Sequence, residues 1–225
     1  MPKIKNRLAE TFLTPGNKKR IPVLLEGIKN YRPYDPGQYL YNIALGFSPK
    51  EKFTPKFIEV VYTTLIAWNM HQRGARLSEF NAFSNCLIQN ETAIRSLEGY
   101  RMEKVKDASD VICELRNLFD NLELVADDRP RLVTFSKTMH FFLPNLLMPL
   151  DRRYTLKYFY NNHTIPTGPK GNDKQFIMYG DVFQQFIELS QAYDFEKHKE
   201  GRWNRNVPKI IDNLLISYIK ESGLE

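Results

Sequence analysis

The chain has 225 residues, of which 42% are hydrophobic and 26% are charged. These proportions are typical of a globular protein with a full core, and they exclude disordered, collagen-like and fibrous classes. The formal net charge of +6 favours a polyanionic partner or an acidic ligand.

No apolar run approaches the roughly 20 residues that a membrane-spanning helix needs. Residues 1–7 lack the apolar stretch of a secretory signal, so we expect a cytoplasmic protein with no membrane partner. Cys86 and Cys113 have no second Cys or His at metal-ligand spacing, and the four histidines are scattered. We therefore expect reduced thiols, no metal and no other cofactor.

Proline and glycine divide the chain into helix-length pieces, and no alternation of period two extends over several of them. The sequence therefore predicts an all-α fold, a single compact multi-helix domain over residues 1–225. We expect N-terminal helices in 1–53, the core with any catalytic residues in 54–160, and C-terminal helices with a basic loop in 161–225. The expected helices cover residues 20–31, 36–46, 54–73, 77–89, 91–99, 107–122, 133–143, 151–161, 174–194 and 207–221.

The helix expected over 54–73 has the clearest pattern and should be central to the core. Thr54 followed by Pro55 is a typical helix start, and Phe57, Leu65 and Trp68 recur on one face. The segments 163–173 and 194–206 are expected to be irregular. In the second, basic residues such as Arg202 surround Trp203, which suits a surface that contacts phosphates and stacks on bases. The alternative is a solvated loop whose tryptophan packs into the core.

The most informative segment is 133–154, which places Lys137 on one helix and Asp151 at the start of the next. Phe135 and its neighbours form the apolar face of the first helix, so we expect Lys137 off that face. A lysine desolvated by phenylalanines loses basicity and becomes a nucleophile, whereas an aspartate at a helix N-terminus is held ionised. The alternative is a solvated lysine and an ordinary capping aspartate.

This segment resembles the catalytic region of the helix-hairpin-helix DNA glycosylase superfamily. In that family a lysine opens the second helix of the hairpin, and a stretch ending in Pro-x-Asp introduces the next helix. Lys137 stands at the first position, and Pro149-Leu150-Asp151 matches the second. The resemblance implies that Lys137 attacks the anomeric carbon, while Asp151 stabilises the oxocarbenium-like sugar or activates the nucleophile.

A second stretch, residues 62–77, is similar to the family's early core helix and to the loop that wedges a side chain into the duplex when a base is flipped out. The resemblance implies that the chain is a monomer that binds double-stranded DNA. The base pocket would be lined by Trp68, Asn69, His140 and Phe141. DNA contacts would come from Gln72, Arg73, Arg76, Arg129, Arg131, Arg152, Arg153, Arg202 and Trp203. Alternatively, Trp68 belongs to the core, and Arg73 with Arg76 closes the helix.

The chain departs from the family where a glycine-rich hairpin should precede Lys137. Residues 127–133 read Asp-Asp-Arg-Pro-Arg-Leu-Val, so the backbone cannot approach a DNA phosphate as closely. Arg129 and Arg131 would have to supply phosphate contacts as side chains. The interval from Lys137 to Asp151 is also shorter than usual, and the missing four-cysteine cluster excludes the iron–sulfur branch.

Two classes of function remain open at this point. The first is a DNA glycosylase, with or without lyase activity, that serves DNA repair or antiviral defence against phage with modified bases. The second is a non-catalytic helical module that binds nucleic acid or a protein, in which Lys137 and Asp151 are structural. If the first is correct, the two side chains should line one pocket beside a positive surface.

Overall fold

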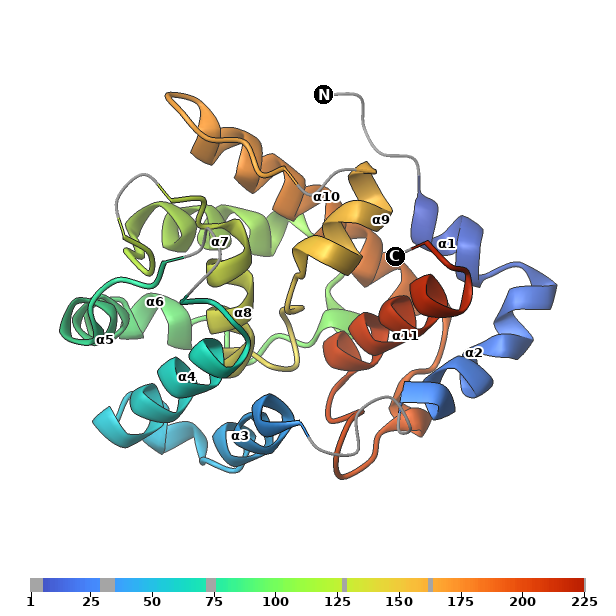
Figure 1. The fold of residues 1–225 in the computed structure, drawn as a ribbon, viewed down its shortest axis with the longest axis horizontal. Coiled ribbons are helices and arrows are strands. Elements are labelled where there is room, and N and C mark those ends of the chain that lie inside the picture. Colours follow the sequence, from blue (N-terminus) through green and yellow to red (C-terminus); the bar gives the residue numbers. More distant parts are fainter. Residues whose placement is uncertain (1–5, 29–34, 72–75, 127–128, 162–163, 225) are drawn as a thin grey trace.

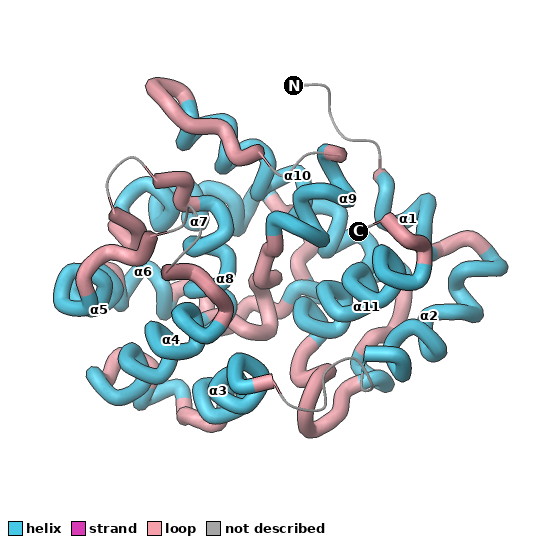
Figure 2. The backbone as a smooth tube through the Cα atoms, in the orientation of Figure 1, coloured by secondary structure: helices cyan, strands magenta, loops and turns pink. Residues whose placement is uncertain are grey.

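The computed structural model describes residues 6–28, 35–71, 76–126, 129–161 and 164–224. Within these ranges the regular structure is helical and no strand forms, apart from an isolated bridge between Leu77 and Val125 (Figure 2). The predicted all-α class is therefore confirmed for this part of the chain. None of the helices in these ranges is both long and apolar enough to cross a membrane.

The elements follow one another with short connections. The first part of the chain forms α1 (Arg7–Phe12), α2 (Pro15–Gly27), α3 (Pro36–Leu45), η2 (Pro49–Glu51), α4 (Pro55–Ala67), α5 (Phe80–Gln89), α6 (Glu91–Arg95), η3 (Met102–Lys104) and α7 (Ser109–Asn121). The second part forms α8 (Leu132–Phe142), η4 (Arg152–Leu156), α9 (Lys157–Tyr160), α10 (Gly171–Ala192), η5 (Glu196–His198) and α11 (Val207–Glu221).

Several of the predicted helix bounds are wrong. The short helix α1 was not predicted, because six residues carry too little periodic pattern. The helix α2 begins at Pro15 rather than at residue 20, since proline suits the first turn of a helix. The helix predicted over 91–99 ends at Arg95, and the one predicted over 151–161 begins with the π-helical turn η4.

The helix α4 begins as predicted but ends at Ala67, before the predicted end at residue 73. Asn69 adopts the left-handed conformation with φ 60°, and its N–H donates to the carbonyl of Ile66 at 2.9 Å. The N–H of Met70 donates to the carbonyl of Leu65 at 3.0 Å. These two bonds form a Schellman motif, which stops the helix directly after Trp68.

The helix α8 is buried on every side, whereas the sequence predicted one apolar face. It contacts α4 and α10, so residues off the predicted face also lie in the core. Figure 1 shows α8 between a group formed by α3 to α7 and a group that contains α1, α2, α9 and α11. Lys137 on α8 is therefore placed in the interior, at 8% exposure.

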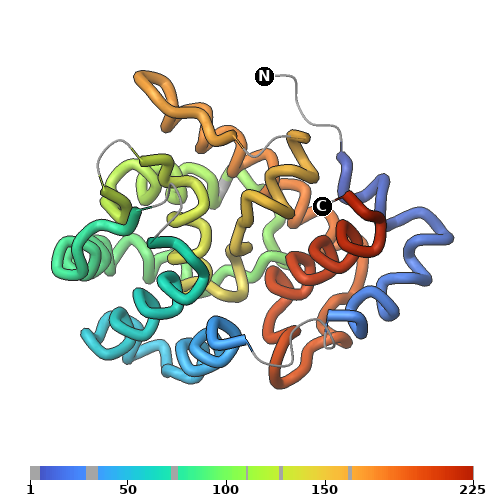
Figure 3. The backbone as a smooth tube through the Cα atoms, in the orientation of Figure 1, coloured from blue at the N-terminus to red at the C-terminus, as the bar shows by residue number. Residues whose placement is uncertain are grey.

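The two ends of the described chain pack against each other. The helix α1 contacts α10, and α2 contacts α11, which in turn contacts η4 (Figure 3). The N-terminal helices thus support the side of the core from which η4 and α9 project.

Candidate active site

Lys137 and Asp151 form an ion pair. The Nζ atom of Lys137 lies 3.3 Å from Oδ2 of Asp151. The lysine is buried, while the aspartate side chain keeps 34% of its surface exposed. The two groups that the sequence singled out are therefore in contact at the edge of the core, with the carboxylate toward solvent.

A hydrogen bond between the neighbours of these two residues holds them in register. Ser136 Oγ accepts from the backbone N–H of Leu150 at 3.0 Å and donates to the carbonyl of Val133 at 3.0 Å. Ser136 and Leu150 are fully buried, so water does not compete for the bond. Because Leu150 precedes Asp151, the bond fixes the start of η4 against α8.

Asp151 is the N-cap of η4. Its Oδ1 accepts from the backbone N–H groups of Arg153 at 2.7 Å and Tyr154 at 3.3 Å. Burial alone would raise the pKa of the Asp151 carboxyl, but the Lys137 ammonium and the two N–H groups more than offset this and hold the pKa below its usual value. Asp151 is therefore ionised at neutral pH. The π-helical turn that follows is a geometry often found at functional sites.

An aromatic wall borders the ammonium group of Lys137. Its Nζ lies 5.5 Å from the ring centroid of Trp68, within the range of a cation–π interaction. The Trp68 ring stacks on Phe141 at 5.4 Å and contacts Tyr41 at 5.8 Å. Gly37 in the first turn of α3 makes room for Trp68, because a Cβ atom at residue 37 would come within 2.5 Å of the indole. The sequence analysis missed Gly37, since a glycine in a predicted helix gives no sign of the ring that packs on it.

His140 does not line a pocket, which corrects its predicted place beside a flipped base. It is fully buried, its Nδ1 donates to the carbonyl of Leu147 at 2.5 Å, and its Nε2 accepts from the hydroxyl of Tyr41 at 2.8 Å. The Tyr41 hydroxyl in turn accepts from Asn206 at 3.1 Å. Burial lowers the pKa of His140 to about 3, so the ring is neutral. The network stabilises the core behind Trp68.

The other three predicted pocket residues differ in exposure. Phe141 is buried behind Trp68, which is itself half-buried, and Asn69 is exposed. Trp68 and Asn69 are therefore the members of this set that reach the surface. The left-handed backbone of Asn69 has a structural reason, because it ends α4.

The predicted DNA contacts fall into three groups. Two of them, Gln72 and Arg73, lie outside the described residues. Those whose side chains are exposed, or half-buried in the case of Arg152, are Arg76, Arg129, Arg152, Arg153 and Arg202. The remaining two, Arg131 and Trp203, make internal contacts.

These internal contacts give Arg131 and Trp203 structural roles. The guanidinium of Arg131 donates to the carbonyls of Phe119 and Asp120 in the last turn of α7, at 3.0 and 3.2 Å. Trp203 is 6% exposed, and its backbone N–H donates to Glu200 at 2.6 Å. In this conformation Arg131 does not extend toward a phosphate, and the ring of Trp203 is packed inside rather than presented to a base.

Asp212 on α11 is a buried carboxylate that the sequence analysis missed. Its Oδ2 accepts from Lys209 Nζ at 2.6 Å, and its Oδ1 has no partner among the described residues. Burial raises the pKa of Asp212, and the charge of Asp151 adds to this, against the opposing charges of Lys209 and Lys137. Two carboxyl groups with opposite pKa shifts therefore act on one lysine. The signal that could have found Asp212 is its position between Ile211 and the apolar residues that follow it.

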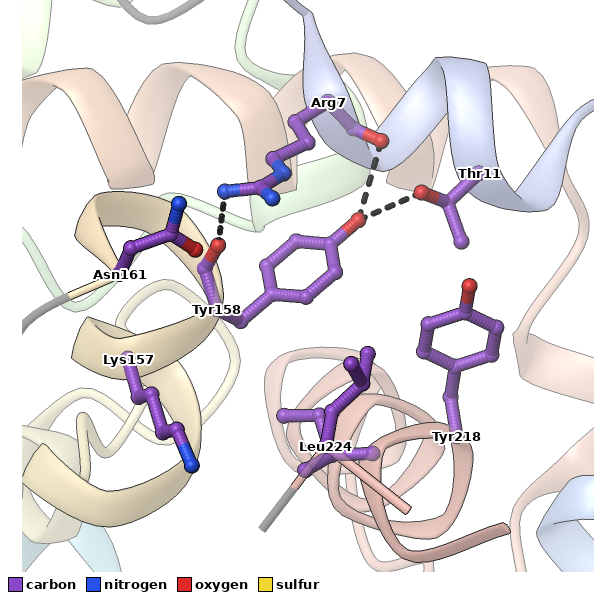
Figure 4. A pocket seen from close by; sticks show the side chains of 8 residues that line it. Arg7, Thr11, Lys157, Tyr158, Asn161, Tyr218 and Leu224 are labelled. Carbon is purple, nitrogen blue, oxygen red and sulfur yellow. Dashed lines mark hydrogen bonds between the residues drawn. The ribbon is translucent and has the colours of Figure 1, made fainter. Parts of the chain in front are cut away.

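A cavity of about 220 Å³ opens between α1, α9 and α11. Neither Lys137 nor Asp151 lines it. Its wall is formed by Arg7, Thr11, Lys157, Tyr158, Asn161, Tyr218, Ile219 and Leu224 (Figure 4).

In the described part of the chain, no three His, Cys, Asp or Glu side chains are grouped so that they could hold a metal ion. Comparisons of the chain with protein-family models, with curated proteins and with solved structures find no match. A functional interpretation therefore depends on the geometry of these side chains.

Proposed function

We propose that the chain is a DNA glycosylase that flips a damaged or modified base out of a duplex and cleaves its glycosidic bond without a cofactor. The observation that carries the proposal is the Lys137–Asp151 contact of 3.3 Å at the first turn of η4. An ionised carboxylate beside an amine and a half-buried tryptophan suits a reaction in which positive charge develops on a sugar.

The chemistry divides between the two side chains. As the bond from C1′ to the base nitrogen breaks, its electron pair leaves with the base, and Asp151 stabilises the positive charge on the sugar. Lys137 passes a proton to the departing base and attacks C1′ with the freed electron pair. One of its two remaining protons then moves to O4′ as the sugar ring opens, which leaves a protonated imine.

The neighbourhood of Asp151 supports a nucleic-acid substrate. Arg152 and Arg153 follow Asp151 directly in η4, and the side chain of Arg153 is exposed. Trp68 and Asn69 lie on the opposite side of Lys137, at the end of α4. Cationic side chains beside the carboxylate suit phosphate contacts on either side of the reacting sugar.

A screen of duplexes that each carry one damaged or modified base tests the proposal, with abasic-site formation as the measurement. We expect at least one duplex to yield abasic sites with the parent protein. On that duplex Asp151→Asn should lower turnover by about 100-fold, by analogy with the loss of one preorganised electrostatic group. Lys174→Gln, a change of an exposed lysine on α10, is the matched control and should leave turnover unchanged.

The variants also decide between modes of attack. If Lys137→Gln still excises the base while Asp151→Asn does not, water is the nucleophile and the enzyme is a monofunctional glycosylase. Full activity in both variants overturns the catalytic assignment. Duplex binding without excision of any base favours the non-catalytic nucleic-acid-binding module instead.

A further inference from the structure

The cavity between α1, α9 and α11 has walls fixed by hydrogen bonds (Figure 4). The hydroxyl of Tyr158 donates to the carbonyl of Arg7 at 3.0 Å and accepts from Thr11 Oγ1 at 2.6 Å. The guanidinium of Arg7 donates to the carbonyls of Tyr158 and Phe159 and lies 5.0 Å from the Tyr158 ring centroid. These contacts join α1 to α9, so the site is formed before any ligand arrives.

Three polar groups reach this cavity without a partner of their own. Among the described residues, the Lys157 ammonium, the Asn161 side-chain amide and the Tyr218 hydroxyl have no hydrogen-bond or ion-pair partner. Each comes from a different part of the wall, since Asn161 follows α9 and Tyr218 lies on α11. Convergent polar groups in a preformed cavity are the usual mark of a binding site.

The charge of the wall selects an anion. Arg7 and Lys157 are cationic, and no acidic side chain of the described residues lines the cavity. Lys220, on the same helix as Tyr218, lies 5.8 Å from the ring of Tyr154 and adds to the positive charge of this side. An ammonium group beside a hydroxyl and an amide suits a phosphate oxygen together with the hydroxyl or ring oxygen of a sugar.

Size and ring geometry exclude a large or stacked ligand. The volume of about 220 Å³ is below the usual range of roughly 300–1,000 Å³ for drug-sized ligands. The Tyr158 ring is covered by Arg7, and the edge-on ring of Tyr218 lies 6.3 Å away at 89°. No open face of Tyr158 remains on which a nucleobase could stack. The ligand is therefore compact and anionic, with little aromatic surface.

We propose that this cavity binds one sugar–phosphate unit of a DNA strand. The inference rests on the proposed function, because Lys157 begins the helix that continues η4, whose N-cap is Asp151. A strand with its reacting sugar at Asp151 can follow η4 past Arg153 and place a neighbouring phosphate against Lys157. The Tyr218 hydroxyl donates a second hydrogen bond to this phosphate.

Two binding measurements test this assignment, one with 2-deoxyribose 5-phosphate and one with an unmodified duplex. Lys157→Gln should weaken both by about tenfold, as expected for the loss of a charge-assisted hydrogen bond. Tyr218→Phe, which keeps the ring, should weaken both by about threefold. Lys174→Gln removes the same charge as Lys157→Gln at an exposed site on α10 and should change neither affinity.

The outcomes separate this proposal from the glycosylase proposal. Weaker binding of both ligands in Lys157→Gln and Tyr218→Phe supports the site, even if no duplex yields an abasic site. Unchanged duplex affinity overturns it: if the free sugar phosphate alone is affected, the cavity takes a small metabolite, and if neither is affected, it takes no sugar phosphate.

Discussion

Two regions of the molecule combine a tryptophan with a cation, and their burial is inverted. In the candidate active site Lys137 Nζ lies 5.5 Å from the ring of Trp68, and in the 194–206 loop Arg202 lies 5.2 Å from the ring of Trp203. Lys137 is buried and Trp68 is half-buried, whereas Arg202 is exposed and Trp203 is buried. The same pair of residue types therefore serves opposite ends.

The difference shows where chemistry can be expected. A buried ammonium costs free energy unless a counter-ion stabilises it, and Asp151 supplies that counter-ion at 3.3 Å. An exposed arginine that covers a buried indole costs little and shields the core with its apolar stem. The first arrangement is the one that calls for a functional explanation.

The largest expected effect on stability lies in the loop. Trp203→Ala should lower the free energy of unfolding by about 3–5 kcal/mol, because a buried indole leaves a large cavity. Trp68→Ala should cost less, since that ring is half-buried. Urea unfolding of the two variants measures the difference. A larger loss for Trp68 than for Trp203 would contradict the inverted burial.

The next effect concerns the counter-ion of Lys137. Asp151→Asn keeps the helix cap but leaves the buried ammonium without a charged partner. We expect a loss of about 2–3 kcal/mol, between the values for surface and for buried pairs. The double variant Lys137→Met and Asp151→Asn should recover much of this loss. Equal stability of Asp151→Asn and the parent would mean that Lys137 does not depend on Asp151.

The sequence predicted the pair of residues but not their surroundings. Lys137 and Asp151 could be found because a lysine among phenylalanines and an aspartate before a helix are local patterns. Trp203 could not be placed, since its burial depends on packing between segments distant in sequence. The same holds for His140, whose partners Tyr41 and Leu147 lie on other elements.

The helix class was predictable because helical periodicity is local, whereas helix ends were less so. The end of α4 depends on the left-handed conformation of Asn69, which asparagine permits but does not require. Asp212 escaped notice because an aspartate in an apolar helix is indistinguishable from a surface residue until α11 is packed against η4. Long-range contacts thus account for most of what the sequence could not predict.

A smaller effect tests the support of Trp68 by α3. Gly37→Ala should lower the free energy of unfolding by about 1–2 kcal/mol, because its Cβ must displace the indole. The shift should also weaken the stacking of Trp68 on Phe141, which is visible in the indole fluorescence. Gly180→Ala, where a Cβ meets open space, is the matched control and should not destabilise the protein.

The smallest effect is the pH dependence of stability that the two carboxyl groups produce. Burial raises the pKa of Asp212 in the folded state, so the parent should lose stability as pH rises from the usual carboxyl range through this raised value. Asp151, with its lowered pKa, should lose its contribution as pH falls below that range. Unfolding measured across pH should show that Asp212→Asn abolishes only the first dependence. Parallel profiles for parent and variant would contradict the raised pKa.

The most direct test of the central claim is borohydride trapping on a duplex that the parent protein cleaves. If Lys137 attacks the sugar, reduction of the imine joins protein and DNA covalently, and peptide mass spectrometry should locate the adduct at Lys137. Lys137→Gln should form no adduct while it still binds the duplex. An adduct at another lysine, or an undiminished adduct in Lys137→Gln, would contradict the assignment of Lys137 as the nucleophile.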